Sequence, residues 1–405
     1  MSRIPDAPET LDKAIPGTGV WATGGWWGVV ARFLVHGLLV STWVSRIPAV
    51  KGAIGLSDGA LGLALLGSAI GSMAGIPVSG WLVSRFGSRR ACTWSSAGYC
   101  LALLLPTTAG SAVQLFLALL VLGFAAGADD VAMNSQAVSM EKLLGEPSMS
   151  RFHGMFSFGG IAGAGLGAFI ARLGVTAPRH LTAASGVILL LSLSTAPLLL
   201  EVGTAAPTVT PPRFSWRNLT APLLLLSAIG FCIFLSEGAI ADWTAVYLKQ
   251  ILRADAGTAA AGYAIFSAAM FLFRLAGDRI TVKLGRAWTI RGGAMLAASG
   301  LGLVVLAPHP LWAMPGLAMA GAGYSSIIPL VFAAGGRVSG TSDGAGVATV
   351  SGLGYLGFLV GPPVIGFISQ MTSLRFGLAF VVTLTALVAV LVGVVQRTGG
   401  KQAFG

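Results

Sequence analysis

Long apolar stretches recur along almost the whole chain and are separated by short polar segments. A helix that crosses a bilayer needs about 20 mostly apolar residues, and the chain has room for about twelve such helices. We expect them at residues 27–48, 58–84, 89–107, 112–140, 152–171, 180–200, 220–248, 257–281, 287–307, 310–336, 344–369 and 375–396. A membrane β-barrel would show alternating segments of about ten residues, which these Gly- and Leu-rich runs lack. The pattern therefore predicts an all-α membrane protein with twelve transmembrane helices.

The composition indicates burial in lipid. Charged residues make up 10% of the chain and apolar residues 55%, with a mean hydropathy of +0.83. A soluble domain carries about 25% charged residues. The three cysteines lie inside apolar stretches without the spacing of a metal site, so we expect small buried side chains. The polar first 25 residues lack the pattern of a cleaved signal.

The net charge of +11 would suggest nucleic-acid binding in a soluble protein. The placement of the charges indicates another role. With both termini in the cytoplasm, the cytoplasmic segments hold 17 of the 25 Lys and Arg residues, and the outer loops hold seven. This asymmetry follows the positive-inside rule. We therefore expect a multi-pass protein of the cytoplasmic (inner) membrane with both termini cytoplasmic, whose partner is the lipid bilayer and not nucleic acid.

One sequence segment occurs twice. Residues 79–89 correspond to residues 277–286, and Gly and Phe positions farther along recur at the same offset of 198. In a membrane chain, such a repeat predicts two similar bundles that face each other, with a solute site between them. The predicted organisation is an N-terminal tail at 1–26, a six-helix bundle at 27–200, a cytoplasmic linker at 201–219, a second six-helix bundle at 220–396 and a C-terminal tail at 397–405.

The repeated segment carries a loop motif. The second copy has Gly277-Asp278 followed by Lys283-Leu284-Gly285-Arg286, and the first copy has Gly80 followed by Arg85 to Arg90, with Ser84 where an acid would be expected. With these motifs the chain resembles the major facilitator superfamily over essentially its whole length. The resemblance implies twelve helices in two pseudo-symmetric bundles, a central cavity and alternating access.

A narrower resemblance involves the fourth and fifth predicted helices. Residues 130–134, with an Asp and an Asn, and residues 153–159, which end in Ser-Phe-Gly, look like the fucose–proton symporter branch of that family. The carboxylate that this branch has in its first helix would fall near Val44 and is absent.

Four of the 14 acidic residues lie well inside predicted helices, namely Asp129, Asp130, Glu237 and Asp242. A charge at the bilayer centre costs at least about 2.5 kcal/mol, so an acid there is a candidate for function. Asp130 shares a helix face with Asn134, whereas Asp129 points about 100° away. We expect one acid to face the cavity and the other to face a neighbouring helix. The predicted proton-coupling residues are Asp130 first, then Asp129 and Glu237, with a buried structural carboxylate as the alternative for the adjacent pair.

Other side chains inside the predicted helices could contact a solute. His36 occupies the place in the first helix that Glu237 has in the seventh, and it is either a titrating group or a hydrogen-bonded packing residue. Arg32, one turn earlier, could neutralise an acid of the fourth helix. Trp43 and Trp243 could stack on a sugar ring or lie in the membrane interface. The predicted substrate-binding residues are His36, Trp43, Asn134, Gln136, Asp242, Trp243 and Tyr324.

Charged residues in and near the repeated loops are candidates for gating. Arg274 and Asp278 lie one turn apart, and such a pair could lock the cytoplasmic side in one state and release it in the other. A topology signal with a solvated salt bridge worth about 0–1 kcal/mol is the alternative. The predicted gating residues are Arg85, Arg89, Arg274, Asp278, Lys283 and Arg286.

Together these features favour a secondary active transporter that moves a small solute by alternating access. We expect protons to drive it, and a sugar is one candidate solute. The alternative is a proton-linked efflux antiporter for drugs or metabolites, since residues 357–363 resemble an antiporter Gly–Pro motif, although in the eleventh helix and not the fifth. The chain shows no catalytic triad, metal cluster or phosphate loop, so we expect no enzyme and no cofactor, and a functional monomer.

Overall fold

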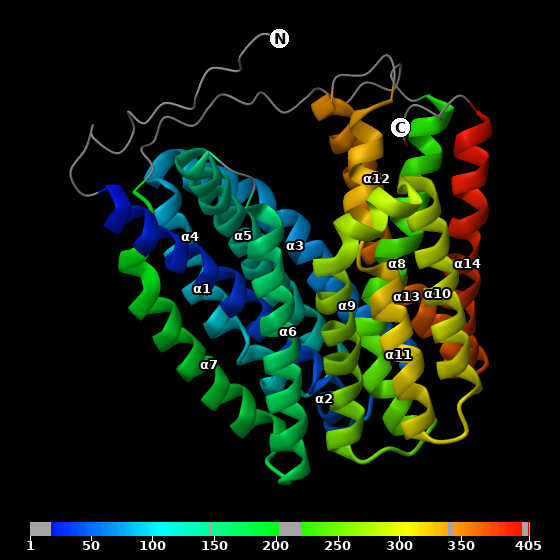
Figure 1. Cartoon of the computed structure of the whole chain (residues 1–405). Coiled ribbons are helices and arrows are strands. Elements are labelled where there is room, and N and C mark those ends of the chain that lie inside the picture. The colour runs from blue at the N-terminus through cyan, green and yellow to red at the C-terminus, as the bar shows by residue number, and fades with distance from the viewer. Residues whose placement is uncertain (1–17, 146–147, 202–219, 339–342, 399–403, 405) are drawn as a thin grey trace.

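The computed structural model describes residues 18–145, 148–201, 220–338, 343–398 and 404. These residues form helices joined by short loops (Figure 1). The elements of the first half are α1 (Thr18–Val44), α2 (Ile47–Ile54), α3 (Asp58–Phe86), α4 (Ser88–Ala102), η1 (Leu105–Thr108), α5 (Ala112–Leu144), α6 (Met149–Arg172), α7 (Ala177–Thr195) and η2 (Ala196–Leu198). Those of the second half are α8 (Ala221–Gln250), α9 (Ala256–Leu284), α10 (Arg286–Leu306), α11 (Pro310–Tyr324), α12 (Ile327–Gly336), α13 (Asp343–Met371) and α14 (Leu374–Arg397).

Eleven helical stretches within the described residues are long and apolar enough to cross a membrane. They match eleven of the twelve predicted spans. The remaining span, predicted at 89–107, is formed by α4 and η1, and α4 alone has 15 residues, fewer than the about 20 that a full crossing needs. The helix α1 begins at Thr18, earlier than the predicted start at 27, and Trp26 packs on the Phe152 ring of α6 at 4.7 Å. Most of the predicted linker, 202–219, lies outside the described residues.

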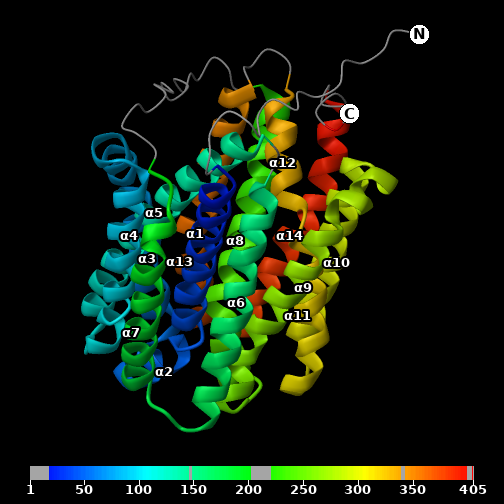
Figure 2. The same cartoon turned by 60° about the vertical axis from the view of Figure 1, so that its left-hand side comes forward.

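The helices form two groups, seen side by side in Figure 1, whereas in the turned view of Figure 2 the two groups overlap near α6 and α8. The first bundle contains α1 to α7 and the second contains α8 to α14. We call the end where the first bundle finishes at Leu200 and α8 begins the linker end, and the opposite end, where α2 lies, the α2 end. In Figure 1 the ribbons of the two bundles lie farther apart at the linker end than at the α2 end.

The sequence repeat is visible in the geometry of the backbone. Helices α3 and α9 both have 29 residues, and their starts lie 198 positions apart. Ser57 and Asp255 cap the two N-termini by accepting backbone N–H bonds. Both helices end at a glycine with positive φ, Gly87 at +84° and Gly285 at +77°, with ψ near 155°. That backbone conformation is essentially restricted to glycine, so the repeated Arg-x-Gly and Leu-Gly segments produce the same sharp turn twice.

Glycines allow close helix contacts inside each bundle. A Cβ atom on Gly71 of α3 would overlap the Leu120 carbonyl of α5. A Cβ on Gly300 of α10 would lie 2.5 Å from the Gly316 carbonyl of α11. In lipid, small residues promote association because the backbones can approach. These contacts make each bundle a tightly packed unit.

The bundles meet closely at the α2 end. A Cβ on Gly62 of α3 would lie 3.1 Å from Gly366 Cα of α13, and one on Gly366 would lie 2.7 Å from the Asp58 carbonyl. Nearby, the Ser57 hydroxyl donates to the Gln370 side-chain oxygen at 3.2 Å. Lys51 of α2 forms an ion pair with Asp58 at the same end. The α2 end is therefore closed by contacts between the backbones of both bundles.

Candidate functional site

A buried acid–imidazole pair lies in the first bundle. His36 Nδ1 of α1 lies 2.9 Å from Asp129 Oδ2 of α5. The Ser95 hydroxyl of α4 donates to the other carboxylate oxygen at 3.1 Å. His36 is 6% exposed and Asp129 is 0% exposed. The pair therefore joins three helices and offers no surface to a solute in this conformation, which favours the packing interpretation of His36 over substrate binding.

The partner of Arg32 differs from the expectation that it neutralises an acid of the fourth helix. Its guanidinium donates to the backbone carbonyl of Ser192 in α7 at 2.7 Å and also to the Ser192 hydroxyl. Ser192 in turn donates to Ser96 of α4 at 2.9 Å. The expectation for Arg32 is wrong because the carboxylate on the neighbouring helix is taken by His36, whereas Ser192 lies beside the guanidinium.

Asp130 has a different environment from its neighbour Asp129. It is partly exposed although it lies far inside α5. Asn134 Nδ2, one turn later, donates to Asp130 Oδ1 at 3.2 Å and to the Asp130 carbonyl at 2.8 Å. The two adjacent carboxylates thus have different environments, as the helix geometry predicts. Asp129 belongs to a buried hydrogen-bond network, whereas Asp130 is partly exposed.

Acids and a cation of the second bundle border the same region. Glu237 and Asp242 of α8 are both partly exposed. Arg274 of α9 lies close enough to Glu237 for their charges to interact. Tyr355 of α13 is 44% exposed, and its hydroxyl lies within the electrostatic reach of Asp130 and Glu237. One carboxylate from each bundle, Asp130 and Glu237, therefore lies within electrostatic reach of the same tyrosine.

Arg274 connects the two bundles. Its NH1 donates to the Ser157 hydroxyl of α6 at 3.4 Å, and its Nε donates to the Ser325 carbonyl at 3.2 Å. These bonds replace the predicted pairing with Asp278, which is exposed. Arg274 thus contributes to the contact between bundles, whereas Asp278 does not share its environment in this conformation.

The second bundle has a buried chain of hydroxyl groups. The Tyr324 hydroxyl lies 2.6 Å from Thr385 Oγ1, which lies 3.2 Å from Ser236 Oγ. All three side chains are fully buried. Tyr324, predicted to bind substrate, therefore joins α11 to α14 and α8.

Three other predicted substrate residues are also buried. Trp43 is 7% exposed and Trp243 is 0% exposed, so both rings pack inside their bundles in this conformation. Gln136 is 0% exposed. Its amide nitrogen donates to Ser88 Oγ at 2.7 Å and to the Leu200 carbonyl at 2.9 Å, and its oxygen accepts from the Leu200 N–H at 2.9 Å. Gln136 therefore fastens the end of the first bundle in this conformation, and its role in solute binding stays a prediction.

The remaining predicted gating residues lie at the linker end. Arg89 forms an ion pair with Glu201 at 2.5 Å. Arg85 and Lys283 are exposed in the last turns of α3 and α9. Arg286 lines a pocket at the start of α10. Their place in the fold agrees with the repeated loops, and their gating role stays a prediction.

Three residues of this region were not among the predicted site residues. His153 of α6 lies within electrostatic reach of both His36 and Arg274, and Ser157 accepts the bond from Arg274. Both belong to the segment that ends in Ser-Phe-Gly, so the motif was a usable signal. Tyr355, like Tyr263, was only a weaker candidate from the sequence, because an aromatic residue in an apolar helix usually packs. Among the described residues, no three His, Cys, Asp or Glu side chains are grouped as a metal site requires.

A family model described as Major Facilitator Superfamily matches residues 28–343. The chain belongs to the major facilitator superfamily. It is 37% identical over 369 residues to an uncharacterized MFS-type transporter of Yersinia pestis, and the match covers 90% of this chain and 94% of that protein. Proteins of this family are transporters, and the chain is one of them. The predicted all-α fold of a multi-pass membrane protein is confirmed.

Solved structures have the same fold as this superfamily member. A mutant of the nucleoside transporter NupG superposes with a TM-score of 0.75 at 12% identity, covering 92% of this chain and 99% of that one. A D-xylose–proton symporter superposes with a TM-score of 0.72 at 14% identity, covering 95% and 99%. At such low identities the likeness is one of fold.

Proposed function

We propose that this transporter couples the movement of a small hydroxylated solute to protons across the cytoplasmic membrane, by alternating access. The observation that carries the proposal is the contrast within one helix between Asp129 and Asp130. Asp129 is fully buried with partners on two other helices, whereas Asp130 is partly exposed and is bonded by Asn134 of its own helix. An acid that can exchange a proton from a partly desolvated site is suited to coupling.

The groups around Asp130 support a solute site between the bundles. Glu237 and Arg274 contribute a carboxylate and a guanidinium from the second bundle, and both can hydrogen-bond hydroxyl groups. Tyr355 stacks on Phe234 with ring centroids 4.7 Å apart, and its own ring is partly exposed. An exposed aromatic face suits the apolar face of a sugar ring. The fold shared with a D-xylose–proton symporter agrees with this proposal.

The proposal includes an orientation. The basic asymmetry of the sequence favours a cytoplasmic linker end. The closed α2 end would then face outward, and the conformation would be inward-facing. The three native cysteines are buried, so single exposed cysteines can report the topology. Ser84→Cys at the linker end should resist an impermeant reagent in intact cells, whereas Ala53→Cys on α2 should react; the reverse labelling would refute this orientation.

The coupling test compares two neutral variants in proteoliposomes with an imposed pH gradient. Asp130→Asn mimics the protonated acid, so it should abolish accumulation of solute while leaving exchange of solute at least partly intact. Glu237→Gln is the competing candidate. If Asp130→Asn accumulates solute and Glu237→Gln does not, the coupling site lies in the second bundle. If both accumulate solute, neither acid is required and the proposed coupling fails.

A further inference from the structure

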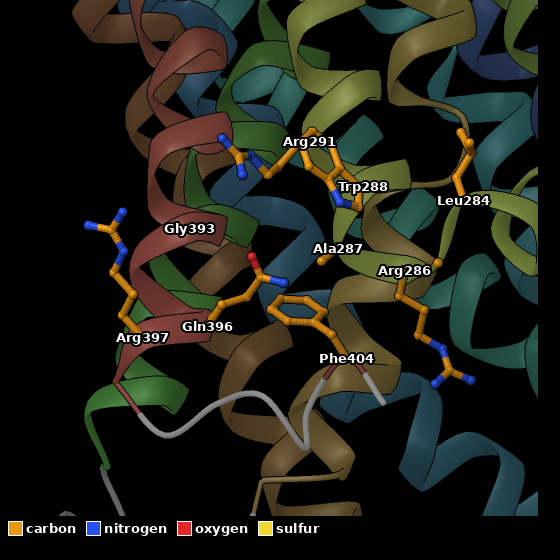
Figure 3. Close-up of a pocket in the computed structure, with 10 residues that line it drawn as sticks. Leu284, Arg286, Ala287, Trp288, Arg291, Gly393, Gln396, Arg397 and Phe404 are labelled. Atoms are coloured by element: carbon orange, nitrogen blue, oxygen red, sulfur yellow. The ribbon is translucent and has the colours of Figure 1, made fainter.

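A basic pocket lies at the linker end of the second bundle, between the start of α10 and the end of α14 (Figure 3). It has a volume of about 520 Å³. Arg286 and Arg291 of α10 and Arg397 of α14 line it. None of its described lining residues is acidic. The charges of Arg291 and Arg397 contribute a positive local field that attracts an anion.

One of these arginines, Arg291, lies over an aromatic ring of its own helix. The Arg291 guanidinium carbon lies 4.9 Å from the centroid of the Trp288 ring. The Arg291 Nε is buried and has no hydrogen-bond partner among the described residues. In Figure 3 Arg291 and Arg397 lie toward α14, with the ribbon of that helix between their guanidinium groups, whereas Arg286 points away. Guanidinium groups offer the N–H donors that bind a phosphate most strongly.

The first turn of α10 forms part of the pocket wall. Its N-cap residue, Gly285, makes no side-chain cap bond. The first backbone N–H groups of a helix have no partner within the helix, and the helix dipole favours an anion there. The helix start therefore adds to the positive field of the arginines.

The surface next to the pocket is apolar. Trp288 and Met295 of α10 are 62% and 58% exposed, and Val390 of α14 is 61% exposed. Met295 follows Trp288 by two helical turns, and Val390 precedes Arg397 by two turns, so each pair shares one helix face. These exposed side chains continue from the pocket toward the middle of the helices, which is the path that an acyl chain would take from a bound headgroup.

We propose that this pocket binds the headgroup of an anionic phospholipid. Arg291 and Arg397 hold its phosphate, Trp288 lies at the level of the membrane interface, and the acyl chains lie along Met295 and Val390. A basic pocket between helices at the membrane surface is suited to such headgroups, and the adjoining apolar face favours a lipid over a soluble phosphate. The proposal does not depend on the substrate or on the coupling ion.

The test uses native mass spectrometry of the purified full-length protein titrated with dioleoyl phosphatidylglycerol or dioleoyl phosphatidylethanolamine. Because the acyl chains are the same, any preference reports the headgroup. We expect wild type to prefer phosphatidylglycerol. The double variant Arg291→Ala/Arg397→Ala should bind it about 30-fold more weakly, which corresponds to about 1 kcal/mol for each cation. The matched control is Arg90→Ala, an exposed arginine at the same end of the first bundle, and it should keep the affinity of wild type.

Equal binding of the two lipids by wild type, or unchanged affinity in the double variant, overturns the proposal. A further measurement uses inorganic phosphate in place of the lipid. If phosphate stabilises wild type as much as the lipid does, and the double variant loses that stabilisation, the site binds soluble anions. The lipid proposal is then wrong. If the double variant does not fold, wild type is crosslinked with a photo-reactive phosphatidylglycerol, and the positions of the crosslinks test the site. Crosslinks to α10 and α14 support the site, and crosslinks elsewhere refute it.

Discussion

The two bundles bury different polar groups at corresponding places. In the first bundle, α1, α4, α5 and α7 are joined by charged or titratable side chains, with His36 on Asp129 and Arg32 on Ser192. In the second, α8, α11 and α14 are joined by hydroxyls centred on Thr385. The backbone repeat is preserved while the chemistry inside it differs. The first bundle is therefore expected to depend on buried pairs that are destabilising when one member is removed, whereas the second depends on weaker hydrogen bonds between hydroxyls.

The largest effect should follow the loss of Asp129. Asp129→Ala leaves His36 without its partner in an interior site, and breaking a buried pair costs about 3–5 kcal/mol. Asp129→Asn retains a polar partner and should cost less. The measurement is the free energy of unfolding in SDS for purified protein. A loss below about 1 kcal/mol for Asp129→Ala would remove the contrast between the bundles.

The second effect tests whether both bundles rely on the same close packing. Gly71→Leu on α3 and Gly300→Leu on α10 insert side chains against carbonyl groups, and overpacking costs about 1–3 kcal/mol. Gly98→Leu on α4 is the matched control, because a Cβ there meets no atom within 4 Å. Thermal unfolding should separate the first two variants from the third. Equal stability of all three would mean that the glycine contacts adjust freely.

The third effect concerns the hydroxyl chain of the second bundle. Thr385→Val removes its hydrogen bonds at nearly constant volume, and each such bond contributes about 0.5–1.5 kcal/mol. Combining it with Tyr324→Phe in a double-mutant cycle should reveal a coupling energy, because the two hydroxyls are 2.6 Å apart. Strictly additive losses would show that the two groups do not act together.

The smallest expected loss of stability concerns the N-caps of α3 and α9, Ser57 and Asp255. Ser57→Ala and Asp255→Ala should each cost about 1 kcal/mol at neutral pH, since both remove an N-cap. Hydrogen bonds from the Thr258 side chain and backbone lower the pKa of Asp255. Its stabilisation is therefore complete above the unfolded pKa of about 4 and is lost as the pH falls through the lower folded value.

Unfolding measured from neutral pH down to about pH 3 checks this difference. The gap between wild type and Asp255→Ala should shrink in acid, whereas the gap for Ser57→Ala should not change, because serine does not titrate. A parallel decline of both gaps would indicate a global acid effect and not the cap.

The fold could be predicted because its signals are local and repeated. Twelve apolar runs predict the positions of the membrane helices. The two repeated Gly-containing loops mark where α3 and α9 end. The site was only partly predictable, since helix periodicity separates Asp129 from Asp130 but does not name their partners. The bond from Arg32 to Ser192 joins residues 160 positions apart, and no periodicity reports such a contact. Tyr355 was only a weaker candidate for the same reason, because its exposure depends on how the two bundles face each other.

The hydrogen bonds between Gln136 and Leu200 have a consequence for biosynthesis. Three hydrogen bonds fasten the last residues of the first bundle to α5 and the start of α4, and Arg89 bonds to the next residue, Glu201. All of these groups are synthesised before α8. These contacts of the first bundle can therefore form while the second bundle is still being synthesised. The two bundles can then assemble in the membrane one after the other.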